Sequence, residues 1–87
     1  MNFLHYKIVV NKGDLVRVKV TGPCFVRMLD TLSFDYYRLG RKFTGFGGWT
    51  DVSAQEFEVP FSGSWHVVVD MGKEEGQVRA TVDIVRK

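Results

Sequence analysis

The 87-residue sequence has only one cysteine and no long apolar run, and each of these two shortages excludes a class of protein. With Cys24 alone, no disulfide can form within the chain, and its neighbours Phe25 and Val26 predict a buried, unreactive thiol. No apolar stretch approaches the roughly 20 residues that a membrane-spanning helix needs. The start of the chain lacks the basic and then apolar pattern of a signal peptide. We therefore expect a cytoplasmic protein with no membrane association.

An excess of charge is also missing, because 12 basic residues are nearly balanced by 10 acidic ones, for a net charge of +2. A dedicated nucleic-acid binder usually carries a larger and clustered basic excess, so nucleic acid is a disfavoured partner. What the chain does have is 45% hydrophobic residues, including seven phenylalanines, which is enough for one compact core.

Alternation of apolar and polar residues dominates the chain, as expected for β-strands with one face on a core. In residues 15–21 three valines face one way, while two cations and a threonine face the other. In residues 24–29 Arg27 marks the outer side, opposite Val26 and Met28. The same reasoning predicts strands over residues 2–10, 15–21, 24–29, 41–46, 55–59, 64–70 and 77–86.

Turn signals recur about every ten residues between these strands, which is typical of sandwiches and barrels. We predict an all-β fold, a single compact antiparallel β-sandwich or small barrel of about seven to eight short strands, formed by residues 1–87 as one domain. Residues 30–35 break the alternation and predict a single helical turn or an irregular loop. Gly47 and Gly48 are predicted to end the strand over residues 41–46.

The two histidines do not indicate an enzyme or a metal site, because neither has a partner at ligand spacing. His66 and Asp70 share a strand face, but at about 3.3 Å per residue they lie roughly 13 Å apart, too far for a dyad. A partner from another strand remains open. We expect His66 to be a surface histidine beside a turn and keep it as a secondary candidate. We expect no catalytic residues, no cofactor and no metal.

Residues 36–49 are the most informative segment, with five aromatic residues, three cations, four glycines and no acid. Arginine binds phosphate or carboxylate bidentately, and tyrosine and tryptophan offer flat stacking faces. The candidate ligand-binding residues are Tyr36, Tyr37, Arg38, Arg41, Lys42 and Trp49, with Gly40, Gly45, Gly47 and Gly48 as loop backbone. The glycines lack the spacing of a nucleotide-fold phosphate loop, but they let a backbone approach a ligand closely.

Strand geometry over residues 41–46 argues against this interpretation, because it points Arg41 and Lys42 to opposite faces. Tyr37, Phe43 and Phe46 then belong to the core, with cations solvated above them. The segment is therefore either a binding surface or a structural loop, and the sequence leaves both open.

Three motifs carry a family resemblance: MNFLHY at residues 1–6, YxxGR at 37–41 followed by GG at 47–48, and PxxGxWHVVVD at 60–70. With them the chain resembles the bacterial "domain of unknown function 1883" family over nearly its whole length. The resemblance implies a compact β-sandwich and supplies no catalytic residues. It also implies a link to TIR domains, to which this domain is joined in some members. This chain has Phe46 where the family pattern has tyrosine, so the hydroxyl that could make a polar contact from that position is missing, and Trp49 follows the glycine pair.

Two hypotheses of function follow. The first is a non-catalytic binding module for a small anionic or nucleotide-like ligand on residues 36–49. The alternative is a protein-interaction or self-assembly module, which forms a homo-oligomer through sheet edges or works with a TIR-type protein in trans. Single-stranded nucleic acid bound by stacking aromatics is a third and weaker hypothesis.

Overall fold

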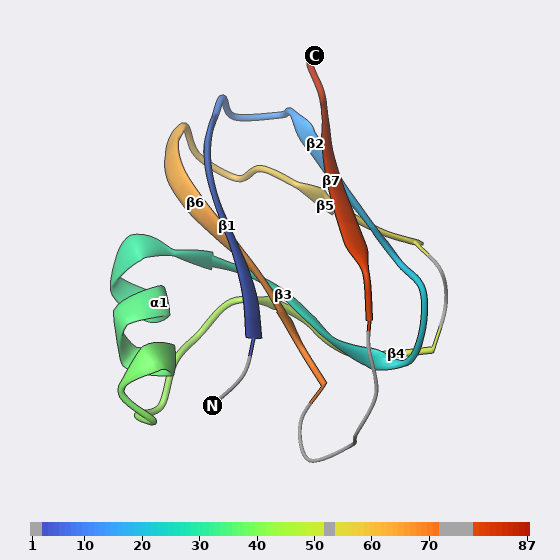
Figure 1. Ribbon diagram of the computed structural model, residues 1–87. Coiled ribbons are helices and arrows are strands. Elements are labelled where there is room, and N and C mark those ends of the chain that lie inside the picture. The colour runs from blue at the N-terminus through green and yellow to red at the C-terminus, as the bar shows by residue number, and fades with distance from the viewer. Residues whose placement is uncertain (1–2, 52–53, 72–77) are drawn as a thin grey trace.

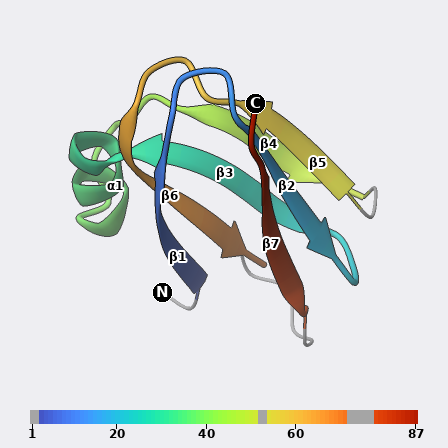
Figure 2. The ribbon, with the colours of Figure 1, turned by 90° about the horizontal axis from the view of Figure 1, so that it is seen from above.

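The computed structural model describes residues 3–51, 54–71 and 78–87, and these form two antiparallel sheets and one helix (Figure 1). The elements are β1 (Phe3–Val10), β2 (Leu15–Val20), β3 (Cys24–Asp30), α1 (Thr31–Arg38), β4 (Phe46–Thr50), β5 (Ala54–Glu58), β6 (Gly63–Asp70) and β7 (Ala80–Val85). One sheet has the order β1-β6-β3-β4 and the other β5-β2-β7. The predicted antiparallel sandwich is confirmed, and its sheets stay open rather than closing into a barrel (Figure 2).

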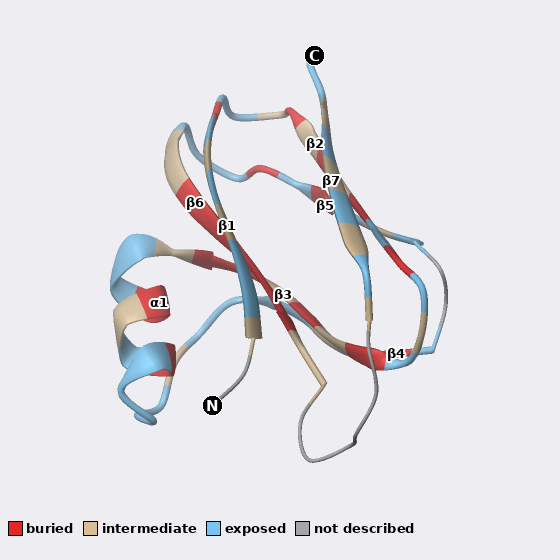
Figure 3. Ribbon diagram, viewed as in Figure 1, coloured by how far each residue is buried: buried red, intermediate tan, exposed pale blue. Residues whose placement is uncertain are grey.

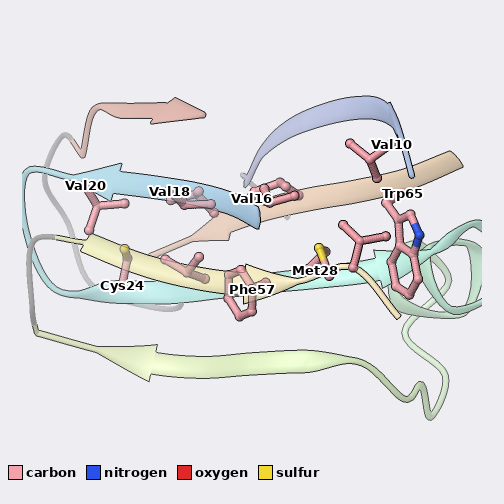
Figure 4. Packing of buried hydrophobic residues seen from close by; sticks show 12 residues of the cluster. Val10, Val16, Val18, Val20, Cys24, Met28, Phe57 and Trp65 are labelled. Carbon is pink, nitrogen blue, oxygen red and sulfur yellow. The ribbon is translucent and has the colours of Figure 1, made fainter. Parts of the chain in front are cut away.

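The main core lies between the two sheets and takes its side chains from both (Figure 4). Val10 and Trp65 lie at one end of it, and Val20 and Cys24 at the other. Its buried members are Val10, Val16, Val18, Val20, Cys24, Val26, Met28, Phe57, Val59, Trp65, Val67 and Val69. Alternation therefore identified the inward residues of these strands correctly. Cys24 is fully buried as predicted, and this burial raises the pKa of its thiol.

A second, smaller cluster lies on the opposite side of the four-stranded sheet, beneath α1. Leu29 and Val68 come from the sheet, and Phe34 and Tyr37 come from the helix. Because β6 is covered on both sides over part of its length, the run from Trp65 to Val69 is buried without a break (Figure 3). We call the side of this sheet that carries α1 the outer face.

Helix α1 corrects the prediction of a single helical turn or irregular loop at residues 30–35. It begins after Asp30, whose side chain accepts a hydrogen bond from the Ser33 N–H at 2.8 Å and so caps the first turn. It continues through Arg38, and Gly40, with a φ of +73°, follows its end. At eight residues the helix is too short to show a clear helical period in the sequence. Among the described residues, no helix has the length and apolar character needed to cross a membrane.

The predicted strand over residues 41–46 is also wrong. Residues 39–45 run from α1 to β4 outside any strand, and Gly47 and Gly48 lie inside β4 rather than ending a strand. Gly47 has a φ of +97°, and a Cβ built there would lie 2.1 Å from the carbonyl oxygen of Val26. The glycine at position 47 therefore allows β4 to approach β3 this closely. Glycine usually weakens or ends a strand, but here it is required for the pairing of β4 with β3.

Smaller differences concern the ends of the strands. The last strand begins at Ala80 rather than at residue 77, and residues 2 and 77 of the predicted strands lie outside the described residues.

Candidate functional site

The outer face carries an arginine with unusual surroundings. The guanidinium carbon of Arg27, on β3, lies 4.9 Å from the ring centroid of Phe25 and 5.1 Å from that of Phe43. Its Nε atom is buried and has no hydrogen-bond partner. Within the part of the chain that the structure describes, the side chain also lacks a salt bridge to an acid. Buried polar atoms almost always have a partner, so this atom needs an explanation.

Aromatic rings extend from Arg27 in two directions. Toward β4, Phe25 meets Trp49 edge-on with ring centroids 5.0 Å apart, and Trp49 is 49% exposed. Toward α1, Phe43 meets Tyr37 edge-on at 5.2 Å. The two strands place Phe25 and Trp49 directly opposite each other in the β3–β4 register. The structure therefore connects Tyr37 and Trp49, twelve positions apart in the sequence, through a row of rings centred on Arg27.

Tyr37 has a structural contact of its own. Its hydroxyl donates a hydrogen bond to Oδ2 of Asp70 at 2.5 Å, and its ring packs against Phe3. Burial, together with the hydrogen bond and the charge of Asp70, raises the pKa of Tyr37 well above its ordinary value. The hydroxyl is therefore a permanent donor that joins α1 to the end of β6, while only the ring faces Phe43.

Tyr36 and Lys42 meet at a shallow hollow beside this row. The hollow lies between α1 and the residues that follow it and is lined by Asp30, Leu32, Ser33, Tyr36, Lys42, Phe43 and Thr44. Phe43 belongs both to this hollow and to the Arg27 site, so the two features adjoin. Two of the candidate residues, Tyr36 and Lys42, are thus brought together.

The remaining cations of the segment lie outside the hollow. Arg38 forms an ion pair with Asp35 at 3.0 Å and extends over the Phe34 ring. Arg41 is exposed, and its backbone N–H donates to the carbonyl of Tyr36. The opposition of Arg41 and Lys42 that strand geometry predicts does not apply, because neither residue is in a strand.

The candidate glycines have separate roles. A Cβ at Gly45 would lie 2.2 Å from Cδ2 of Leu29, whereas one at Gly40 or at Gly48 would meet nothing within 4 Å. Gly45, like Gly47, therefore allows the backbone to pass close to β3, and these two glycines serve packing.

His66 corrects the prediction of a surface histidine, because it is only 5% exposed. Its Nδ1 lies 2.7 Å from Nε2 of His5, and its Nε2 lies 3.0 Å from the hydroxyl of Thr31. The Phe34 ring lies flat over both imidazoles, with centroids 4.1 Å from His5 and 4.5 Å from His66. The partner from another strand, which the sequence left open, is thus a second histidine.

The histidine pair holds one proton between two nitrogens, because one ring must donate and the other accept. Partial desolvation lowers the pKa of both imidazoles, although only His66 is buried and His5 keeps contact with solvent. The charges of Arg38 and Lys7 lower the pKa of His5 further, and the charges of His5 and Lys7 do so for His66. In the described part of the chain, no three side chains of the metal-binding types come together as ligands.

Sequence reasoning missed Arg27 and His5 as site residues. The alternation of residues 24–29 placed Arg27 on the outer side, but nothing in the sequence showed that Phe43 would lie over it. His5 and His66 become neighbours only through the pairing of β1 with β6, in which Lys7 is opposite His66. The outward positions of His5 and His66 on two strands were a signal that the sequence contains. The sequence did not show that these two strands pair with each other.

The fold and the outer face define a small two-sheet β-sandwich with one helix packed on the four-stranded sheet. The chain belongs to the family described as "Domain of unknown function (DUF1883)", whose model matches residues 1–87. The resemblance noted in the sequence is thereby confirmed. Comparisons with curated proteins and with solved structures give no match.

Proposed function

We propose that this protein is a non-catalytic binding module whose outer face takes a small anionic ligand with a flat ring, such as a nucleotide-like compound. The observation that carries the proposal is Arg27, a cation held between two phenyl rings with a buried nitrogen that lacks a partner. A guanidinium fixed in this way loses little freedom when it binds phosphate or carboxylate. The half-exposed Trp49 and the ring of Phe25 beside it offer the flat surface for stacking.

The charges on this face support an anion rather than a cation. Among the described residues three acids lie here, and each has a partner: Asp30 accepts from the Ser33 N–H, Asp35 pairs with Arg38, and Asp70 accepts from the Tyr37 hydroxyl. Arg41 and Lys42 are exposed and form no salt bridge within the described residues. Asp35 is paired with a cation, and Arg27, Arg41 and Lys42 outnumber the two other carboxylates, so an anion at Arg27 would meet net positive charge from the described residues.

We also propose that the protein works in the bacterial cytoplasm. Its single cysteine is buried and unpaired, which suits a reducing compartment.

Calorimetry against a panel of nucleotides and sugar phosphates tests this function. We expect Arg27→Ala to weaken binding about 10- to 100-fold, because hydrogen bonds to a charged group contribute about 1.5–3 kcal/mol. Arg27→Lys keeps the charge but loses the planar fork, so it should recover only part of the affinity. Arg17→Ala is the control, since Arg17 lies on the three-stranded sheet and pairs with Glu56 at the surface. Absence of binding across the panel, or unchanged affinity in Arg27→Ala, would contradict the proposal.

Strand β4 favours self-assembly as a second candidate function. It is an edge strand of sequence FGGWT without a charge, whereas the edge strands β1, β5 and β7 each contain a charged residue. Charged edge residues are a common protection against strand pairing. An antiparallel pair of two β4 strands centred on Gly48 would place each Trp49 opposite the partner's Gly47. The family resemblance adds a TIR-type protein in trans as another partner for this edge.

Light scattering across a concentration series separates this candidate from the first. We expect the wild-type protein to form a dimer that Trp49→Lys converts to a monomer, because the lysine places like charges near the centre of the symmetric pair. Val9→Lys is the matched control on edge strand β1, where Val9 is 67% exposed. A wild-type monomer at all concentrations, or equal dimerisation of all three proteins, would exclude pairing through β4.

A further inference from the structure

Three rings from three elements meet on the outer face. His5 comes from β1, His66 from β6 and Phe34 from α1. The imidazole planes are nearly parallel, at 17° to each other, and the phenyl ring is nearly parallel to both, at 16° to His5 and 3° to His66. Thr31, at the start of α1, completes the group through its bond to His66. The helix therefore rests on the histidine pair through one ring and one hydroxyl.

The bond between the imidazoles depends on their protonation. It needs an N–H on one of the two facing nitrogens and a lone pair on the other. The pair can satisfy this when it is neutral or carries one extra proton, but not when both rings are charged. Two imidazolium rings would bring two N–H groups and two positive charges together at a nitrogen separation of 2.7 Å. Full protonation is thus incompatible with the observed packing.

The candidate ligand site depends on the same helix. Phe34 and Tyr37 are the aromatic residues through which α1 packs on the sheet, and Tyr37 also contacts Phe43 beside Arg27. Tyr36, the residue before Tyr37 in α1, lines the hollow with Lys42. Loss of the Phe34 contact would leave Tyr37 as the main aromatic residue that holds α1 on the sheet. Any movement of α1 would then disturb the hollow and the side of the Arg27 site that Phe43 and Tyr37 form.

We propose that the His5–His66 pair is an acid-sensitive latch that holds α1 on the sheet and, with it, the ligand site in its binding arrangement. The regulatory part of this proposal rests on the proposed function, whereas the latch itself does not.

The surroundings of the pair set the direction of the pH effect. Lys7 on β1 and Arg38 on α1 face the pair and oppose its protonation, together with burial, while Asp35 on α1 and Asp30 at the end of β3 favour it. The net result is a lowered pKa for both rings compared with the ordinary value of 6.5. The form in which α1 has left the histidine pair therefore binds more protons below about pH 6.5 than the form in which α1 is packed on it. The contact between α1 and the pair consequently weakens as the pH falls. Uptake of one or two protons shifts the equilibrium by about 10- to 100-fold per pH unit.

Hydrogen exchange of the ligand-free protein tests the latch. After correction for the intrinsic exchange rate, amides of α1 should lose at least about 10-fold of their protection between pH 6.5 and 5.0. Amides of β2, which is central in the other sheet, serve as the internal control and should keep theirs. Constant α1 protection from pH 7.5 to 5.0, or parallel loss in β2, would overturn the proposal.

Two further measurements keep the test decisive. The double variant His5→Gln/His66→Gln should show α1 protection that does not depend on pH in this range, and the same dependence as wild type would refute the latch. If this variant does not fold, NMR titration of the wild-type imidazoles decides, because the latch requires the second of the pair's two protonation steps to lie below 6.5, the ordinary value for histidine. Ligand affinity at pH 7.5 tests the proposed function separately, since exchange is followed without ligand.

Discussion

Replacement of Trp65 by alanine is expected to lower the free energy of unfolding by about 3–5 kcal/mol. The indole is 2% exposed at one end of the main core and packs against the rings of Phe61 and Phe46 at 4.7 and 6.1 Å. Its Nε1–H also donates to the carbonyl of Phe61 at 3.0 Å. Alanine would leave a cavity and remove this donor. Because small domains have only about 5–15 kcal/mol of stability, this loss is a large fraction of the total, and urea denaturation followed by circular dichroism should show a transition at a much lower urea concentration.

The second tryptophan provides the matched control for this prediction. Trp49 lies in the same sheet but is 49% exposed, and its main ring contact is the edge-on pair with Phe25. We expect Trp49→Ala to cost only about 0.5–1.5 kcal/mol, the contribution of one aromatic pair. Equal losses of stability in the two variants would show that Trp65 does not anchor the core. The comparison also matters for function, because Trp49 can then be changed in binding experiments without unfolding the protein.

Gly47→Ala should have the second-largest effect and is expected to destabilise the protein by more than about 2 kcal/mol. The residue has a φ of +97°, where a side chain is strained by about 1–3 kcal/mol. Its new Cβ would also lie 2.1 Å from the carbonyl oxygen of Val26, a backbone atom that cannot move without disturbing the β3–β4 pairing. Thermal unfolding measures the loss, and amide exchange in β3 and β4 locates it.

The neighbouring glycine is the natural control. A Cβ at Gly48 would meet nothing within 4 Å, and its φ is not in the left-handed region. We expect Gly48→Ala to change stability by no more than about 0.5 kcal/mol. If both alanine variants had the same stability, close approach of the strands at Gly47 would not be the reason for glycine there.

Much of the fold could be predicted from the sequence because strand alternation is a local property. In β2, Val16, Val18 and Val20 are buried as their spacing predicts, and the same holds for Trp65, Val67 and Val69 in β6. Cys24 could be placed in the core from its apolar neighbours. In each case the side chain points inward because the pleat repeats every two residues, and that period does not depend on which strand lies next to it.

The candidate site could be predicted only in part, because its geometry depends on which strands pair. The basic and aromatic character of residues 36–49 drew attention to the face on which Arg27 lies, but not to Arg27 itself. Tyr37 is positioned by Asp70, 33 residues away, and His66 by His5, 61 residues away. No local pattern encodes contacts over such distances in the sequence.

The sequence by itself determined an all-β antiparallel fold with one main core, either a sandwich or a small barrel, because apolar residues that alternate with polar ones form strands with one buried face. The tertiary structure decided that the strands form two open sheets. Only the tertiary structure decided that Gly47 lies inside a strand, that a two-turn helix packs on one part of the outer face, and that two histidines form a hydrogen bond next to it. The physical reason is the same for all three. Each depends on one segment packing against another, and the free energy of such contacts comes from a neighbour that is distant along the chain.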